Sequence, residues 1–563
     1  MRNRIANALR CALHLLPEVL LVLFVLSLLP LGVLGVAEIK RQVAMLWGSP
    51  NTYWETVVHS PWPGVATAAC IVGLAAFLFV LWRCWGALWA VARKMIIEAL
   101  HRKSVAVLLV FFAVLTFTLP FVVKTEGSVK SRVQLVMSYS LVLALVLLSI
   151  LAIFASAASI CGEVEHKQVH ITDSKPLRRW QFLLGKWFGV VVMCMGILFA
   201  MSGGVYLLIL LLAQPPNVER LLARDQTRAL VEYNSLLEEV LVARRTFYPH
   251  EPPGVDEAAE KAYQETAKAG NLPVTGMGRR RLRREIRGNV LGMMMTIEPG
   301  GRFVWQFEGL KPMQEGKLFV RFKAYASTVT GKLMGRWLVL NRQLVQAESG
   351  KSEYRYRLVV PPVLPPQGGW SVVGFQNFEI PAGAVAPDGT LFLAYENADR
   401  TGNVTFPGDQ LLNIMQREGA FLPNYYRTVV IMFCHVALLA AIGLAAGSIF
   451  SFPVASLIAS FFVIVGLVGP WVVSIMTPIA SAEKPPYWLE LRREVWYAFA
   501  RVILGIMPHF GKYNPLGNLS DGRTVPWAAV AYAGSVMLLV KGLGALLVGM
   551  YVYARRELAR VIV

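Results

Sequence analysis

The sequence predicts an α-helical polytopic membrane protein of about eight transmembrane helices, with an inserted extracytoplasmic α+β domain. Of its 563 residues, 55% are hydrophobic and 16% are charged, whereas soluble domains carry about 25% charged residues. Several apolar runs reach the about 20 residues that a helix needs to cross a bilayer. One long polar stretch interrupts these runs and is large enough to fold as a domain of its own.

Eight apolar runs are candidate spans, and they lie near residues 16–37, 63–90, 104–124, 133–160, 187–213, 427–450, 454–478 and 526–553. We expect the first run to be retained, because it is longer than the apolar part of a signal peptide and lacks a clear small-residue cleavage site. Lys and Arg in the short loops favour a cytoplasmic N-terminus, and an even number of spans returns the C-terminus to the same side. The net charge of +20 then reflects basic loops beside an anionic leaflet rather than nucleic-acid binding.

The polar stretch, residues 214–426, joins the fifth span to the sixth and is expected outside the membrane. Its first part, 214–298, is predicted to be helical, because apolar residues recur every three or four positions in "NVERLLARDQTRALVEYNSLLEEVLVARR". Its second part, 299–405, is predicted to be strand-rich, because segments such as "KLFVRFKAY" alternate with period two. Gly and Pro breaks between these segments predict a β-sandwich or jelly roll.

Two further polar segments are predicted to be helical. The basic run "GRRRLRREIRG", 278–288, is interpreted as a solvated basic helix, with contact to anionic lipid or an acidic polymer as the alternative. Before the last span, residues 483–525 contain an amphipathic, aromatic-rich part, Tyr487–Met507. This part is too charged to span, so we expect helices in the outer membrane interface.

A short charged loop, "GEVEHKQVHITDSKPLRRWQFLLGKWFG", connects the fourth and fifth spans. Glu163 and Glu165 follow the fourth span, and Lys186 lies where the chain re-enters the membrane. Pro176 suits the first turn of a short helix, where its missing N–H is not needed. From the residues alone, an amphipathic helix across the membrane face and an ordinary basic loop are both open.

The loop resembles the cytoplasmic loop of ABC (ATP-binding-cassette) transporter permeases of the type-2 exporter class. The resemblance rests on an acidic pair, a Lys-Pro step, an Arg and a "LLGK" re-entry. It extends to "VARKMIIEALHRKS", similar to the connecting helix of that family, and to "NPLGNLSDGR" near the C-terminus. Three features depart from the family pattern: the first two spans, the length of the outer domain, and "KQVHI" in place of a frequent Gly-Thr.

The resemblance implies a division of the chain and a role for the loop. It implies an extra helix pair at 1–92, a first half of the permease core at 93–213, the outer domain at 214–426 and a second half at 427–563. In the family this loop, here 162–186, is the coupling helix that docks on the ATPase. The coupling residues it implies here are Glu163, Glu165, Lys175, Pro176, Arg178, Arg179, Gly185 and Lys186.

The resemblance also implies partners and a location. We expect a separate cytoplasmic ATP-binding-cassette ATPase subunit, a second permease subunit in a homo- or heterodimer, and a bacterial inner (plasma) membrane. ATP would bind the partner, so no cofactor and no catalytic residue are expected in this chain. The nearest match to a phosphate-binding loop, "ESGKS" at 348–352, has Val345 where the motif requires Gly.

Other polar residues invite more specific roles. His166 and His170 are four residues apart, but their order does not match a metalloprotease motif, so we favour polar docking contacts over a metal site. Lys541 lies near the middle of the last span and is expected to line a transport pathway or to pair with a carbonyl or an acid. His435, in the sixth span, is the other candidate for the pathway, with a satisfied polar contact as the preferred interpretation.

Two classes of function remain open at this stage. The first is the permease subunit of an ATP-driven exporter, which would transport a solute or remodel the envelope. The second is a membrane-anchored receptor or enzyme that acts through its extracytoplasmic domain, although no recognisable hydrolase or metalloprotease motif supports it. The small residues of "AAIGLAAGS" at 440–448 fit either internal packing or a dimer seam.

Overall fold

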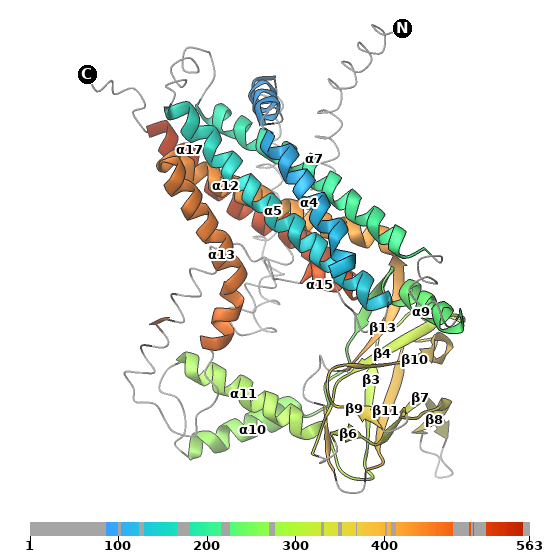
Figure 1. Cartoon of the computed structure of the whole chain (residues 1–563). Coiled ribbons are helices and arrows are strands. Elements are labelled where there is room, and N and C mark those ends of the chain that lie inside the picture. The colour runs from blue at the N-terminus through green and yellow to red at the C-terminus, as the bar shows by residue number, and fades with distance from the viewer. Residues whose placement is uncertain are drawn as a thin grey trace, which may run out of the picture. The chain divides into compact units, whose positions relative to one another are not determined.

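The computed structural model divides into two compact units, which are described separately (Figure 1). A helical unit comprises Met1–Leu241, Phe421–Pro478 and Phe499–Val563, and a strand-rich unit comprises Val242–Ala420 and Ile479–Ala498. The structure describes residues 86–99, 103–122, 129–165, 179–214, 226–269, 276–327, 331–346, 352–366, 369–399, 402–406, 412–476 and 514–555, with 492, 495, 496 and 499. The first predicted span, most of the second and the segment Tyr487–Met507 lie outside these residues, apart from those four positions.

Long apolar helices dominate the helical unit. Its elements are a helix at 86–99, α4 (Lys103–Val122), α5 (Val129–Glu165), α7 (Arg179–Leu212), α9 (Gln226–Glu239), α12 (Phe421–Ile449), α13 (Phe452–Met476), α15 (Pro515–Ser520), α16 (Trp527–Tyr532), the π-helix η2 (Ala533–Gly542) and α17 (Leu543–Arg555). Among the described residues, five helices are long and apolar enough to cross a membrane: α4, α5, α7, α12 and the continuous helix Trp527–Arg555. These five coincide with predicted spans, and α13 contributes a shorter apolar helix, Phe452–Gly466.

Helix α12 packs closely on α5 through small residues. A Cβ atom added to Gly443 would lie 2.0 Å from Ser156 Oγ and 3.1 Å from the carbonyl oxygen of Ile153. At Gly447, one turn later, an added Cβ would lie 3.2 Å from the carbonyl oxygen of Ala157. The small residues that the sequence assigned to packing or to a dimer seam therefore pack inside the chain, where they allow two helix backbones to approach.

The contact predicts that Gly443→Ala destabilises the helical unit. The new methyl group would press on α5, and overpacking of this kind costs about 1–3 kcal/mol. Gly196→Ala in α7 is the matched control, because nothing lies within 4 Å of its Cβ position. Thermal unfolding of the purified chain should show a lower midpoint for Gly443→Ala and no loss for Gly196→Ala; equal midpoints would contradict the close contact.

Antiparallel strands form the strand-rich unit. The strands are β1 (Val242–Phe247), β2 (Thr296–Ile297), β3 (Arg302–Phe307), β4 (Lys317–Phe322), β5 (Tyr325–Ala326), β6 (Lys332–Leu333), β7 (Gly335–Gln346), β8 (Ser352–Val363), β9 (Trp370–Ser371), β10 (Gln376–Pro381), β11 (Leu391–Asn397), β12 (Val404–Thr405) and β13 (Leu412–Ala420). Two four-stranded sheets have the orders β1-β13-β4-β10 and β3-β11-β7-β8. A three-stranded sheet, β2-β12-β5, and a pair, β6-β9, complete the described sheets. The prediction of a strand-rich region is therefore confirmed in its coarse form.

One aromatic-rich core joins the two four-stranded sheets. Trp337 on β7 is fully buried, and its ring centroid lies 4.9 Å from that of Phe322 on β4 and 5.0 Å from that of Tyr395 on β11. Alternate residues of the strands point into this core, which is the arrangement that the period-two pattern predicts. Inward-facing side chains of both sheets belong to the same hydrophobic cluster.

The helical prediction for 214–298 is wrong over β1. The apolar spacing of "EEVLVARR" continues that of the preceding helix, but α9 ends at Glu239 and residues 242–247 form a strand. This strand pairs antiparallel with β13, with Val242 opposite Ala420. The strands also extend beyond the predicted limit of residue 405, because β13 reaches Ala420. Pairing between distant segments decided the structure here, and local periodicity could not show it.

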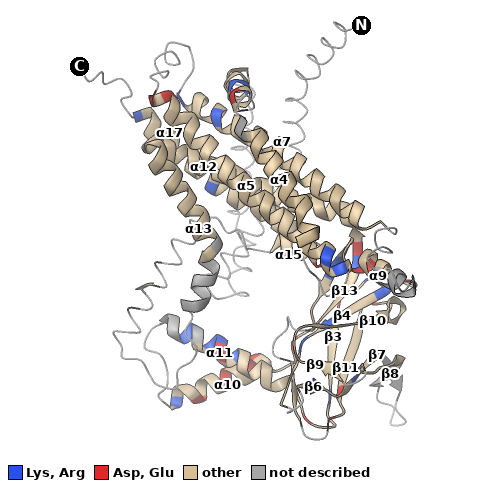
Figure 2. Cartoon of the chain, viewed as in Figure 1, with Lys and Arg blue, Asp and Glu red and all other residues tan. Residues whose placement is uncertain are grey.

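The basic run folds as a helix that pairs with an acidic one. Helix α11 (Gly276–Met294) packs beside α10 (Val255–Lys268), and Figure 2 marks basic and acidic positions in colour along the two ribbons. Arg287 contacts Glu251 at 2.5 Å and Asp256 at 2.9 Å, and Arg283 contacts Glu260 at 3.5 Å. Part of the basic charge is thus neutralised within the unit.

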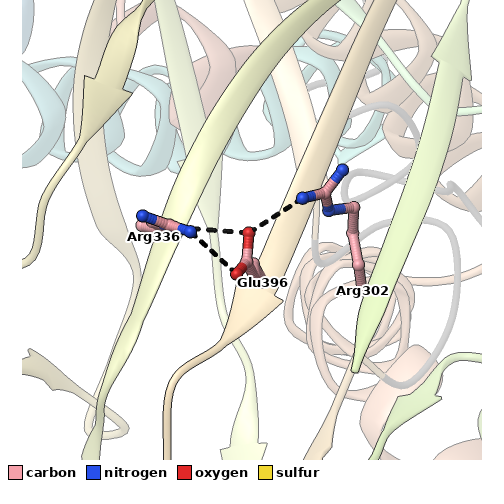
Figure 3. Close-up of polar contacts among 3 residues, drawn as sticks. All are labelled: Arg302, Arg336 and Glu396. Carbon is pink, nitrogen blue, oxygen red and sulfur yellow. Dashed lines mark hydrogen bonds and ion pairs between the residues drawn. The ribbon is translucent and has the colours of Figure 1, made fainter. Parts of the chain in front are cut away.

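A cross-strand ion cluster spans three strands of the β3-β11-β7-β8 sheet (Figure 3). Glu396 on β11 lies opposite Arg302 on β3 and Arg336 on β7. The Glu396 carboxylate accepts hydrogen bonds from Arg336 Nη2 at 2.9 Å and from Arg302 Nη2 at 3.1 Å. Chiefly because Arg336 donates to it, the pKa of the Glu396 carboxyl is lowered below its usual range.

The cluster predicts a pH-dependent contribution to stability. The pKa of Glu396 is lowered in the folded state. The ionised carboxylate therefore stabilises the folded protein fully above the unfolded carboxyl pKa of about 4.3. This stabilisation is lost as the pH falls through the folded-state pKa. We expect Glu396→Gln to lower the melting temperature at pH 7, and the difference from wild type to shrink as the pH drops below about 4. A difference that stays constant with pH would contradict the assignment.

Candidate coupling site

The predicted coupling loop lies between the end of α5 at Glu165 and the start of α7 at Arg179. Of the predicted coupling residues, Glu163, Glu165, Arg179, Gly185 and Lys186 are described. Residues 166–178 lie outside the described part of the chain, and with them Lys175, Pro176, Arg178, His166 and His170. The structure therefore gives the two ends of the loop and the helices that hold them.

Glu163 and Lys186 form an ion pair between α5 and α7. Lys186 Nζ lies 3.0 Å from Glu163 Oε2, and the side chains are 4% and 15% exposed. Lys186 also donates a hydrogen bond to the carbonyl oxygen of Ser159, and its Nζ lies 4.7 Å from the centre of the Phe182 ring. We call this pair the α5–α7 clamp. A buried ammonium group is tolerated only when it is paired and hydrogen-bonded, as this one is.

The structure adds the environment of the Lys186 side chain to the expectation from the sequence. The sequence places this residue where the chain re-enters the membrane and does not show which way its side chain points. In the structure its side chain turns into the helical unit and is buried, because Glu163 and the Ser159 carbonyl provide partners there. Glu163 also faces the exposed Lys94 of the 86–99 helix, whose Nζ lies 3.9 Å from Oε1.

Gly185 lies where the 86–99 helix crosses α7. A Cβ atom added to Gly185 would lie 2.9 Å from Val91 Cβ and 3.1 Å from the carbonyl oxygen of Leu88. One turn later, an added Cβ at Gly189 would lie 3.0 Å from Ala92 Cα. The "LLGKW" stretch thus combines a glycine for close helix approach with the lysine of the α5–α7 clamp.

Glu165 and Arg179 have a different environment. Glu165 is exposed at the last residue of α5. Arg179 is half-buried at the first residue of α7, and its Nη1 donates a hydrogen bond to the carbonyl oxygen of Ala554, at 3.0 Å, near the end of α17. The predicted coupling residues therefore fall into two groups. Glu163, Gly185 and Lys186 hold helices together, whereas Glu165 and Arg179 flank the loop where a partner could reach them.

The two residues predicted for a transport pathway lie on neighbouring helices. His435 is buried in α12, 3% exposed, and Lys541 is half-buried at the penultimate residue of η2. The π-helix itself was not predicted. Such segments are rare and often occur at functional sites. Among the described residues, no group of three or more His, Cys, Asp or Glu is arranged to hold a metal ion.

Sequence reasoning missed Asn424, a buried residue near the start of α12. Its Oδ1 accepts from the backbone N–H of Val525 at 2.7 Å, and its Nδ2 donates to the carbonyl oxygen of Arg523 at 2.8 Å. From α5, Gln134 Nε2 donates to the carbonyl oxygen of Ser520 at 2.9 Å. These side chains fix the turn between α15 and α16. An amide at the edge of an apolar run was the only signal in the sequence.

Comparison with known proteins gives one match. Residues 89–230 match the family of ABC-2 family transporter proteins. The matched segment contains α4, α5, the predicted coupling loop and α7, so it includes the α5–α7 clamp. No curated protein and no solved structure matches the chain.

The match supports a permease subunit of an ABC transporter. Together with the five apolar helices of the described residues, it implies a multi-pass membrane protein. Permeases of the ABC-2 family generally partner with an ATP-binding-cassette ATPase. The match ends within the α9 region, so the strand-rich unit lies beyond it.

Proposed function

We propose that this chain is the membrane-spanning permease subunit of an ATP-driven ABC exporter. It would couple hydrolysis by a separate cytoplasmic ATPase subunit to transport across the membrane or to remodelling of the envelope. The observation that carries the proposal is the α5–loop–α7 arrangement inside the matched segment, where a buried ion pair joins the two helices on which the loop is built.

The mechanism follows from how the loop is anchored. A partner that pushes on Glu165, Arg179 and the loop between them would act on α5 and α7 together. Glu163, close to the end of α5, and Lys186, about two turns into α7, join these helices. Lys94 and the close approach at Gly185 bring the 86–99 helix into the same assembly. Coupling requires that the partner bind one conformation of this assembly more tightly than another.

The rest of the proposal concerns topology and partners. We place the chain in a bacterial inner (plasma) membrane as one half of a homo- or heterodimer, with both termini cytoplasmic and the strand-rich unit extracytoplasmic. ATP would bind the partner subunit, with no cofactor or catalytic residue in this chain and no nucleic-acid partner. Lys541 and His435, on adjacent helices, are proposed to border the transport pathway, since polar groups within membrane helices face the interior or a wet path.

The test is to uncouple the transporter without unfolding it. The chain is purified with its ATPase subunit in lipid, and the ATPase rate is measured with and without the permease. We expect the double variant Glu165→Ala with Arg179→Ala to reduce ATPase stimulation by about fivefold or more, which is the lower end of typical coupling energies. Both residues flank the loop, so insertion and folding should be preserved.

The matched control removes a glutamate and an arginine from the strand-rich unit. Glu260→Ala with Arg283→Ala breaks the 3.5 Å contact between α10 and α11, and it should leave stimulation at the wild-type level. Wild-type stimulation in the Glu165/Arg179 variant, or failure of any ATPase to copurify with the chain, would overturn the proposed function.

A further inference from the structure

A cavity of about 230 Å³ lies within the helical unit, beside the α5–α7 clamp. Residues of the 86–99 helix, α4, α5, α7 and α13 line it. Its walls are mainly apolar and include Met95, Val105, Leu151, Phe154, Met193 and Phe452. An apolar cavity of about 150 Å³ already takes up benzene, whereas pockets for drug-sized ligands measure about 300–1,000 Å³. The volume and the walls fit part of one hydrocarbon chain.

The surroundings of the cavity indicate where such a chain comes from. Phe154, which lines the cavity on α5, is 43% exposed. On the neighbouring helices, Val114 of α4 is 58% exposed and Leu457 of α13 is 71% exposed. In a membrane-spanning unit these side chains face lipid tails, because no water is present at that depth. The nearest source of a hydrocarbon chain is therefore the bilayer itself.

Two residues of opposite charge on the 86–99 helix, one lining the cavity and one a turn away, match the two charges of a zwitterionic headgroup. Glu98 lines the cavity, and Lys94 lies one helical turn before it, so both project from the same face of the 86–99 helix. Both residues are exposed, and the side chain of Lys94 is 70% accessible. A phosphate beside Lys94 and an ammonium group beside Glu98 would each meet the opposite charge. A glycerol headgroup carries no ammonium group that could meet Glu98.

We propose that this cavity binds one acyl chain of an ethanolamine phospholipid, with the phosphate at Lys94 and the ammonium group at Glu98. The bound lipid would lie directly beside the α5–α7 clamp. Ser159 lines the cavity and its carbonyl oxygen accepts the hydrogen bond of Lys186, and Lys94 faces Glu163. The site requires only that these helices lie in a bilayer, which is part of the proposed function, and it does not require ATP.

The experiment uses the full chain in nanodiscs, without nucleotide or ATPase. The probes are phospholipids with a photoreactive group on one acyl chain and either an ethanolamine or a glycerol headgroup, and the labelled peptides are identified by mass spectrometry. We expect labelling concentrated on peptides that contain Met95, Phe154 or Met193. The ethanolamine probe should label them about tenfold more than the glycerol probe, which corresponds to about 1.4 kcal/mol.

Three variants decide the outcome. Ala155→Trp places a large ring among the lining residues and should reduce this labelling about tenfold, whereas Val114→Trp, on the exposed face of α4, should leave it unchanged. Glu98→Gln should keep the chain labelling and abolish the preference for ethanolamine. If Ala155→Trp fails to fold, Glu98→Gln still decides, because an unchanged headgroup preference overturns the proposal.

Uniform labelling of the apolar surface in the wild type would also overturn it. Lipid labelling is measured without nucleotide or ATPase, so it does not depend on coupling. Loss of lipid labelling with normal ATPase stimulation would refute the lipid site alone, and normal labelling with absent stimulation would refute the proposed function alone.

Discussion

Glu163→Leu is expected to destabilise the helical unit by about 3–5 kcal/mol, the usual cost of removing one partner of a buried ion pair. The substitution leaves Lys186, with its side chain only 4% exposed, without the carboxylate that lies 3.0 Å away. The carbonyl oxygen of Ser159 remains as an acceptor, but it carries no full charge. The melting temperature of the purified chain, and its yield in the membrane, measure the effect.

The double variant separates structure from function. Glu163→Leu with Lys186→Met replaces the pair by apolar groups, which in other buried pairs restores much of the lost stability. We therefore expect the double variant to be clearly more stable than Glu163→Leu alone. Lys94→Met is the control, because its 3.9 Å contact with Glu163 is exposed and such pairs contribute about 0–1 kcal/mol. If the double variant is no more stable than Glu163→Leu, the two residues do not interact as the structure shows.

Trp337→Ala is expected to destabilise the strand-rich unit by about 3–5 kcal/mol, as truncation of a large core aromatic does. The indole is fully buried, and its ring also contacts Trp305 at a centroid distance of 5.8 Å. Removing it leaves a void between the two four-stranded sheets, because both contribute side chains to this core.

Hydrogen exchange of the full chain can locate that effect. The amides of β4, β7 and β11 should lose protection in Trp337→Ala, while those of α5 and α12 in the helical unit should keep theirs. Val373→Ala is the control within the same unit, since that side chain is 82% exposed. Unchanged protection of the three strands would show that the core does not depend on the indole.

The sequence predicted the membrane helices well because their signal is local. The run 104–124 became α4, Lys103–Val122, and the run 427–450 became α12, Phe421–Ile449. About 20 consecutive apolar residues leave the backbone no alternative to a helix in a bilayer. The strand β1 was missed for the opposite reason, since its six residues depend on β13, which lies at the far end of the insert.

The candidate site was predicted only in part. The residue types drew attention to the loop. They could not separate residues that a partner subunit could contact from residues that pack helices together within the chain. Lys186 of α7 is buried because Glu163 and the carbonyl oxygen of Ser159, both on α5, contact its ammonium group. Position 185 needs a glycine because the 86–99 helix crosses α7 there. Both facts depend on contacts between segments distant in the sequence. The roles expected for Glu165 and Arg179 stay predictions until coupling is measured.

The pairing of Val242 with Ala420 has a consequence for how the strand-rich segment is inserted in the chain. Residues opposite one another in an antiparallel ladder lie about 4.5–5.5 Å apart, so the chain leaves the helices and returns to them at almost the same point. Phe421 begins α12 directly after Ala420, with no connecting residue. A short hairpin could therefore replace residues 242–420 and connect Leu241 directly to Phe421.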